Sequence, residues 1–194
     1  MRIAIALFDG AEELDWAGPW EVLASWALGW PDDGVEVLTV AETTGPVCCA
    51  NGLRVLADRT WDELGAVDVL VYPGGVGTRV QLGDERIRER MRSRAAAGTL
   101  MASVCTGSLV FADAGLLDGR PATTHWGALE LLATLGEGVE VRPEARFVDD
   151  GEIVTAAGVS AGIDVALHLV ARLHSAERAA EVRREIQYDP EPPV

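Results

Sequence analysis

The chain has 194 residues, is 48% hydrophobic, and carries 31 acidic against 16 basic side chains, for a net charge of −15. This length and composition predict a single domain over residues 1–194 with one substantial core. The acidic balance argues against DNA, RNA and anionic membranes as partners, and no apolar run approaches the ~18 residues of a membrane span. The first apolar run is too short for a signal peptide, and three cysteines predict no disulfide framework. We therefore expect a cytoplasmic protein.

Strand and helix signals alternate through the first half of the chain. Helix formation is predicted from Pro19 to Leu28, with Pro19 in the first turn. Cys48 and Cys49 are neighbours on a predicted strand, so we expect their side chains on opposite faces as packing residues. The pair Asn51-Gly52 is typical of a hairpin turn. Strands are predicted at residues 2–8, 34–41, 48–57 (one strand or two short ones) and 67–72.

The second half continues the alternation without a linker or a repeat. A hairpin is expected where Asp149-Asp150-Gly151 separates two short apolar runs, and Ser175 is a suitable N-cap for the last helix. Strands are predicted at residues 99–104, 145–148 and 152–156. Helices are predicted at residues 84–97, directly after Cys105, at 161–173 and at 175–187.

This order of elements predicts an α/β fold. Continuous apolar strands that alternate with helices indicate a mostly parallel sheet covered on both faces, a three-layer sandwich. In such sheets the sites form beyond the carboxyl ends of the strands, where the topology changes direction. Three segments leave strand ends with glycine or reactive side chains, at residues 9–18, 73–77 and 105–108. We expect them to converge on one site.

Cys105 stands where one apolar run stops at a small polar corner and another begins. The first run predicts a buried strand and the second a helix. A cysteine on this turn is expected to expose its sulfur at a helix N-terminus, where the dipole and free N–H groups lower the pKa of the thiol. We therefore interpret Cys105 as a nucleophile on a strand-to-helix elbow. A buried structural cysteine is the alternative.

The first loop holds four carboxylates ahead of a helix. Glu12 and Glu13 suit a role at the helix dipole or in solvation. Asp15 differs because the apolar Leu14 and Trp16 flank it, which predicts an inward side chain. A carboxyl beside a thiolate would keep its proton, since two adjacent anions repel each other. Asp15 is therefore a candidate proton donor, with a structural acid as the alternative.

Two further segments bear on the site. Gly74-Gly75-Val76-Gly77 could aim backbone N–H groups at a developing negative charge, although such a turn is most often only a turn. It is not a phosphate loop, because no Gly-Lys-Ser/Thr follows, and it is not a dinucleotide fingerprint, because Val80 stands in place of the third glycine. His125 is a candidate base for Cys105, and a structural histidine is the alternative. Three scattered histidines and no cysteine pair at ligand spacing predict no metal site.

At these residues the chain resembles the ThiJ/PfpI superfamily, the cysteine branch related to class I glutamine amidotransferases. The resemblance covers essentially the whole chain. It rests on Gly10–Asp15, Pro73-Gly74-Gly75, Cys105 at the corner and Thr123-Thr124-His125. It implies a flavodoxin-like sandwich, an acid at Asp15 that contacts the elbow cysteine, and a pocket formed in part by the backbone of Gly75 and Val76.

Narrower matches resemble the isocyanide hydratase branch of this superfamily, in Ser103–Val110, Ala122–Trp126, Ala161–Asp164 and the tail Tyr188–Pro193. They imply an enzyme that converts a small isocyanide to an N-formamide without a metal or cofactor. Cys105 would add to the isocyanide carbon to form a thioimidate, and Asp15 would supply the proton and then assist the attack of water. Thr106 would help to place the reacting groups, and Trp16 and His125 complete the expected substrate-binding set.

Departures from the superfamily pattern bear on which activity is expected. Asp15 and Thr106 stand where other members carry Glu and, in some, His, which favours a hydratase over a His-assisted peptidase. A glyoxalase-like or amidase activity of the same thiol, with Gly75 holding an oxyanion and His125 as base, is one alternative. A non-enzymatic redox or ligand sensor is another, because an exposed thiolate oxidises readily. By analogy with the superfamily we expect a homodimer acting on a small molecule.

Overall fold

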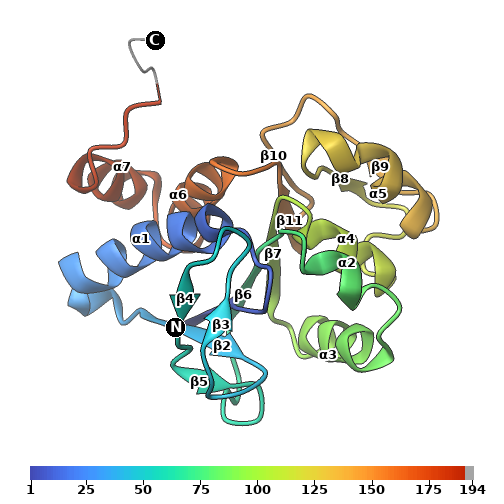
Figure 1. The fold of residues 1–194 in the computed structure, drawn as a ribbon. Coiled ribbons are helices and arrows are strands. Elements are labelled where there is room, and N and C mark those ends of the chain that lie inside the picture. Colours follow the sequence, from blue (N-terminus) through green and yellow to red (C-terminus); the bar gives the residue numbers. More distant parts are fainter. Residues whose placement is uncertain (191–194) are drawn as a thin grey trace.

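A mostly parallel sheet forms the centre of the computed structural model, which describes residues 1–190 (Figure 1). The end of the predicted tail motif, residues 191–193, lies outside the described residues. Within them, seven strands run in the order β10-β11-β7-β6-β1-β2-β5, and β10 is the antiparallel one. Their bounds are β1 Arg2–Ala6, β2 Glu36–Ala41, β5 Arg59–Thr60, β6 Val69–Tyr72, β7 Leu100–Val104, β10 Phe147–Asp149 and β11 Ile153–Ala156. Two short pairs stand beside the sheet, β3 Val47–Cys48 with β4 Arg54–Val55, and β8 Pro121–Ala122 with β9 Glu140–Val141.

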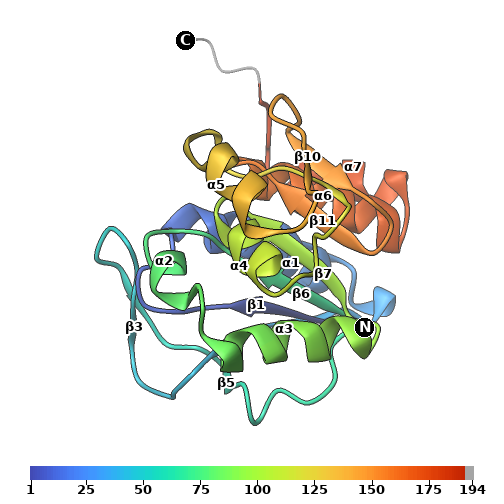
Figure 2. The same cartoon turned by 90° about the vertical axis from the view of Figure 1, so that its right-hand side faces the viewer.

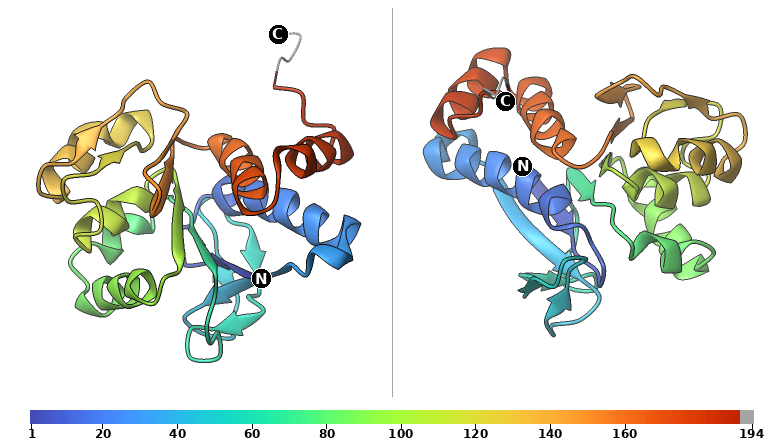
Figure 3. Two further views of the ribbon diagram at one scale, coloured as in Figure 1. Left: turned by 180° about the vertical axis from the view of Figure 1, so that it is seen from behind. Right: turned by 45° about the horizontal axis from the view of Figure 1, so that its top comes forward.

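Helices cover both faces of this sheet, as Figures 1 and 2 show from two sides. One layer holds α1 Glu13–Gly29, α6 Ala161–Leu173 and α7 Ala176–Glu185. The other holds α2 Thr78–Gln81, α3 Glu85–Ala96, α4 Gly107–Asp113 and α5 Leu129–Leu135. The right-hand view of Figure 3 separates the two layers. The predicted three-layer α/β sandwich is confirmed. None of the described helices combines the length and the apolar character needed to cross a membrane.

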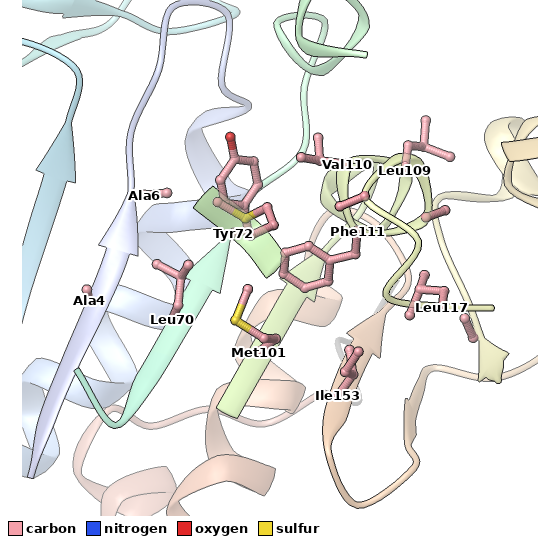
Figure 4. Close-up of a cluster of buried hydrophobic side chains, with 14 of the residues drawn as sticks. Ala4, Ala6, Leu70, Tyr72, Met101, Leu109, Val110, Phe111, Leu117 and Ile153 are labelled. Carbon is pink, nitrogen blue, oxygen red and sulfur yellow. The ribbon is translucent and has the colours of Figure 1, made fainter. Parts of the chain in front are cut away.

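The alternation of side chains along each strand gives the sheet two cores. Side chains that point to one face of the sheet, such as Ile5, Val71 and Val104, pack with α1 and α6. Side chains that point to the other face, Ala4, Leu70 and Met101 among them, pack beneath α3 and α4. Figure 4 shows this second cluster, in which Phe111 of α4 lies against Tyr72 with ring centroids 6.0 Å apart. Both faces of the central strands are apolar, which is why their sequences are continuous apolar runs.

The start of α1 corrects the sequence prediction. The helix begins at Glu13, so Pro19 lies inside it rather than in its first turn. Pro19 has no N–H to give to the carbonyl four residues earlier, which normally weakens a helix. Close packing on α6 offsets this loss: a Cβ built on Gly18 would lie 3.0 Å from Ile163, and one on Gly162 would lie 3.0 Å from Pro19 Cδ. The small residues at Gly18 and Gly162 let the two helices approach closely.

The topology places a switch point between β1 and β6. The chain leaves β1 for β2 on one side and later returns to β6 on the other side. The loops that follow β1, β6 and β7 therefore meet beyond one edge of the sheet, the position at which α/β proteins form their sites. The predicted hairpins, β3–β4 and β10–β11, are confirmed. The short α2, α5, β5, β8 and β9 were not predicted.

Candidate active site

Cys105 lies between the end of β7 and the start of α4, with a left-handed backbone conformation of φ 56°. Such a φ is uncommon for a residue with a side chain. Several hydrogen bonds hold it. The Cys105 N–H donates to the carbonyls of Ala156 and Ala157 at 3.1 and 3.2 Å, and its carbonyl accepts from Ser108 Oγ at 3.2 Å and Thr124 Oγ1 at 2.8 Å. The strained conformation is therefore fixed by neighbours from separate segments.

The side chain of Cys105 is buried, with 5% of the residue exposed. The expectation of an exposed sulfur is wrong. Burial, together with the charge of Asp15, raises the pKa of the thiol to about 12, against the opposing effect of the Thr106 N–H. The expected lowering of this pKa is therefore also wrong, because the loss of solvation outweighs the helix N-terminus.

Asp15 lies in the first turns of α1 and is fully buried, which confirms the inward orientation predicted from its apolar neighbours. Its Oδ2 accepts a hydrogen bond from the Gly74 N–H at 2.9 Å. Burial raises the pKa of the carboxyl to about 7, and the charge of Glu12 adds to the rise, while Gly74 and the Cys105 thiol oppose it. Oδ1 is buried and has no hydrogen-bond partner of regular geometry among the described residues. A carboxyl with this pKa can exchange a proton near neutral pH.

Two glycines after β6 let these groups meet. A Cβ on Gly74 would lie 2.4 Å from the Thr106 nitrogen and 2.9 Å from Asp15 Oδ2, so any side chain there would separate the acid from the thiol's neighbour. Gly75 has a φ of +118°, which favours glycine. Its N–H donates to Thr106 Oγ1 at 3.0 Å, so this proposed oxyanion donor already has an acceptor. This hydrogen bond ties the glycine turn to Thr106, the residue that follows Cys105.

A cavity of about 250 Å³ opens onto the thiol. It is lined by Glu12, Gly75, Val76, Arg79, Cys105, Thr106, His125 and Val159. Five residues predicted from the sequence thus meet here, and Asp15 lies beneath them. Larger hollows lie elsewhere, one of them about 530 Å³ at the amino-terminal ends of β7 and β11. They contain no cysteine, and the reactive groups decide in favour of the cavity at Cys105.

The structure differs from the sequence prediction in which side chains line the cavity, and Trp16 and Arg79 are the main examples. Trp16 does not line the cavity. It packs against the apolar cluster that includes Leu7, Val47 and Cys49. Arg79, Glu12 and Val159 do line it and were not predicted. For Arg79 the available signal was its place just after the glycine turn, at the carboxyl end of a strand.

His125 lines the cavity, yet its hydrogen bonding argues against a role as base for the thiol. Its Nδ1 accepts from the Gly127 N–H at 3.2 Å, so the proton of the neutral ring belongs on Nε2. No hydrogen bond joins His125 to Cys105 within residues 1–190. Gly158 packs against both side chains: a Cβ there would lie 2.6 Å from His125 Cδ2 and 3.0 Å from Cys105 Sγ. The ring faces the same space as the sulfur, as a hydrogen-bond donor.

The remaining candidates for chemistry lie apart from this cavity. Cys48 is exposed and Cys49 is buried, as expected for neighbours that point to opposite faces. His168 and His174 pair with Asp149 at 2.6 Å and Asp33 at 3.3 Å. In the part of the chain that the structure describes, no three His, Cys, Asp or Glu side chains gather to hold a metal ion.

Known proteins share this architecture. The model of the DJ-1/PfpI family matches residues 1–172. An isonitrile hydratase of Pseudomonas putida is 39% identical over 193 residues, which cover 100% of this chain and 81% of the relative. The HTH-type transcriptional regulator CdhR of Pseudomonas aeruginosa is 33% identical over 141 residues, 73% of this chain but 41% of the regulator. The crystal structure of a ThiJ/PfpI family protein from Pseudomonas syringae has a TM-score of 0.89 and 34% identity, with 100% of this chain and 77% of that chain covered.

Proposed function

Because this chain belongs to the DJ-1/PfpI family, we propose that it hydrates a small isocyanide to an N-formamide, with Cys105 on a nucleophile elbow and Asp15 as the acid and base. The observation that carries the proposal is the buried pair itself: a thiol and a carboxyl of pKa about 7 at the floor of a cavity of about 250 Å³. The 39% identity to an isonitrile hydratase over the full chain supports the choice of reaction.

The first half of the proposed reaction adds the thiol across the isocyanide carbon. The Asp15 carboxylate accepts the S–H proton as Cys105 Sγ bonds to that carbon, and the carboxyl then gives the proton to the same carbon. One S–H bond is broken, one S–C and one C–H bond are formed, and the product is a neutral thioimidate. A thiol of raised pKa suits this order, because the proton needed at carbon is already in the site.

The second half returns the thiol. Asp15 takes a proton from water as the hydroxyl adds to the thioimidate carbon, and it then gives that proton to the nitrogen. As the C–S bond breaks, the added hydroxyl becomes the carbonyl of the N-formamide, and its proton passes through Asp15 to Cys105 Sγ. The sum is one isocyanide plus one water to one formamide. Val76 and Val159 provide the apolar part of the cavity lining, against which the hydrocarbon group of the isocyanide would pack.

The test is hydration of 4-nitrophenyl isocyanide by the purified protein in H2O and in D2O. We expect the N-formamide, with deuterium on the formyl carbon in D2O because that hydrogen comes from the exchangeable Asp15–Cys105 pair. Mass spectrometry of quenched reactions should locate the thioimidate on the peptide that contains Cys105. Turnover of methylglyoxal with no formamide would instead favour the glyoxalase-like activity. Sulfenic acid at Cys105 with neither turnover would favour a sensor.

A further inference from the structure

Arg79 is a cation without an acid partner at the cavity of Cys105. The chain has a net charge of −15, and arginines such as Arg88, Arg120 and Arg178 are held by carboxylates. Among residues 1–190 no carboxylate lies within ion-pair distance of Arg79, which is exposed. Arg79 shares this lack of an ion pair with a few other described arginines, but it is the arginine that lines the cavity of Cys105.

Hydrogen bonds tie this arginine to the reactive corner. Arg79 Nη1 donates to Thr78 Oγ1 at 2.9 Å. Thr78 Oγ1 lies 3.1 Å from Thr106 Oγ1 and 2.8 Å from the Gly75 carbonyl. Thr106 directly follows Cys105. The Nη1 end of the guanidinium is therefore held near Cys105 by Thr78. Its remaining N–H groups are available to a ligand in the cavity.

Glu12 is the other charged residue of the lining. Its Oε1 accepts from Asn51 Nδ2 at 3.0 Å, so the carboxylate is engaged by a neighbour from the β3–β4 loop. Glu12 weakens the attraction of an anion to the cavity without occupying Arg79. The guanidinium matches a carboxylate in shape as well as charge, because its N–H groups can donate in parallel to both oxygens.

We infer that Arg79 binds a carboxylate of the substrate, so that the favoured substrates are small isocyanides that carry an acid group. This inference rests on the proposed function for the identity of the reacting group, and on the cavity alone for the anion. Arg79 is then a specificity-determining residue, and neutral isocyanides are the poorer substrates.

The charge preference is measured without the isocyanide reaction by alkylating the native protein with iodoacetate and with iodoacetamide. With both reagents the sulfur displaces iodide from a CH2 group. The two reagents are similar in size, and only iodoacetate is an anion. Peptide mass spectrometry gives the rates at Cys105 and at exposed Cys48, which serves as the internal reference. We expect Arg79→Gln to lower the iodoacetate-to-iodoacetamide ratio at Cys105 by about three- to tenfold, and Glu12→Gln to raise it. Arg184→Gln removes the same charge from the exposed face of α7 and should leave the ratio unchanged.

The substrate class is tested by comparing 4-isocyanobenzoate with its methyl ester. The wild type should show a higher kcat/KM for the acid, and Arg79→Gln should lose that preference through a raised KM for the acid, while Arg184→Gln should keep both the preference and the rate with the ester. Hydration of both compounds at equal rates, with an alkylation ratio that does not respond to Arg79, would overturn the inference and leave the proposed function standing. Hydration of neither, with a ratio that does respond, would overturn the isocyanide reaction and retain Arg79 as a carboxylate anchor.

Discussion

Two buried cysteines of this chain lie against neighbouring residues of one helix. Cys105 interacts with Asp15 and Cys49 with Trp16, which follow each other in the first turns of α1. The two thiols are buried to the same degree, 5% and 4% exposed. Burial raises the pKa of each thiol. Neither exposure nor the direction of the pKa shift therefore separates the proposed nucleophile, Cys105, from the packing residue Cys49.

The partner and the backbone make the difference. Cys49 is surrounded by Leu7, Ala41 and Val47, and the nearby Trp16 Nε1 has no regular hydrogen bond. Cys105 instead has a carboxyl that titrates near neutral pH, a left-handed backbone and a cavity above its sulfur. A buried thiol becomes chemically useful where the structure places a proton acceptor and a space for substrate beside it.

The largest expected effect separates the two cysteines directly. Cys105→Ala should reduce isocyanide hydration by about 1,000-fold or more, since it removes the atom that forms the covalent bond. Cys49→Ala, the matched control at equal burial, should retain activity within about twofold and lose about 1 kcal/mol of unfolding free energy for the small cavity it leaves. Formamide production and urea unfolding measure both variants. Full activity of Cys105→Ala would contradict every thiol mechanism proposed for this site.

The next effect concerns the carboxyl that distinguishes the two sites. The pKa of Asp15 is 3.8 in the unfolded chain and about 7 in the fold. Between these values the unfolded chain gives up the proton that the folded protein keeps, so this group's contribution to stability is complete below pH 3.8 and is lost as the pH rises to about 7. From pH 5 to pH 8 the loss amounts to about 2 to 3 kcal/mol. Asp15→Asn, which stays neutral, should flatten this fall in urea unfolding measured at the two pH values.

The hydration rate of Asp15→Asn tests the catalytic role of the same carboxyl. Asp15→Asn should lower the rate of hydration by about 100-fold or more, because an amide cannot carry the proton between the thiol, the carbon and water. Retained activity, together with an unchanged pH dependence of stability, would assign Asp15 a purely structural role. The carboxyls with lowered pKa, such as Asp113 and Asp150, titrate below this pH window and do not mask the effect.

The sequence predicts the sheet and the corner because both are local patterns. The strands are continuous apolar runs, and Asp15 is a single acid between apolar neighbours. In each case the adjacent residues are enough to predict that the side chains are buried. The start of α1 escapes such reasoning, since Gly18 and Pro19 are kept in the helix by contacts with Ile163 and Gly162, more than 140 positions away.

The pKa shifts in the site could not be predicted from the sequence, for a related reason. The pKa of Cys105 depends on how far the loops after β1 and β6 exclude water, and that is a property of the assembled fold. Val159 lines the cavity from a segment with no motif of its own, and Arg79 follows the glycine turn without belonging to it. A residue type and its neighbours can nominate a nucleophile, but the direction of its pKa shift follows from what covers it.

Trp16 gives the smallest expected effect and the sharpest check of the comparison. Its indole packs with Cys49 and not in the cavity, and Trp16→Phe removes an N–H that is buried without a regular partner. The substitution loses packing contacts and the interaction of this N–H with the Cys49 thiol, but it also removes a buried donor that lacks a regular hydrogen bond. These effects act in opposite directions, so the unfolding free energy should change by less than about 1 kcal/mol. KM and kcat for a small isocyanide should stay within about twofold of the wild type. A several-fold rise in KM would mean that Trp16 reaches the substrate, as its place beside Asp15 in the sequence predicts, and that one helix turn serves the reactive thiol with both residues.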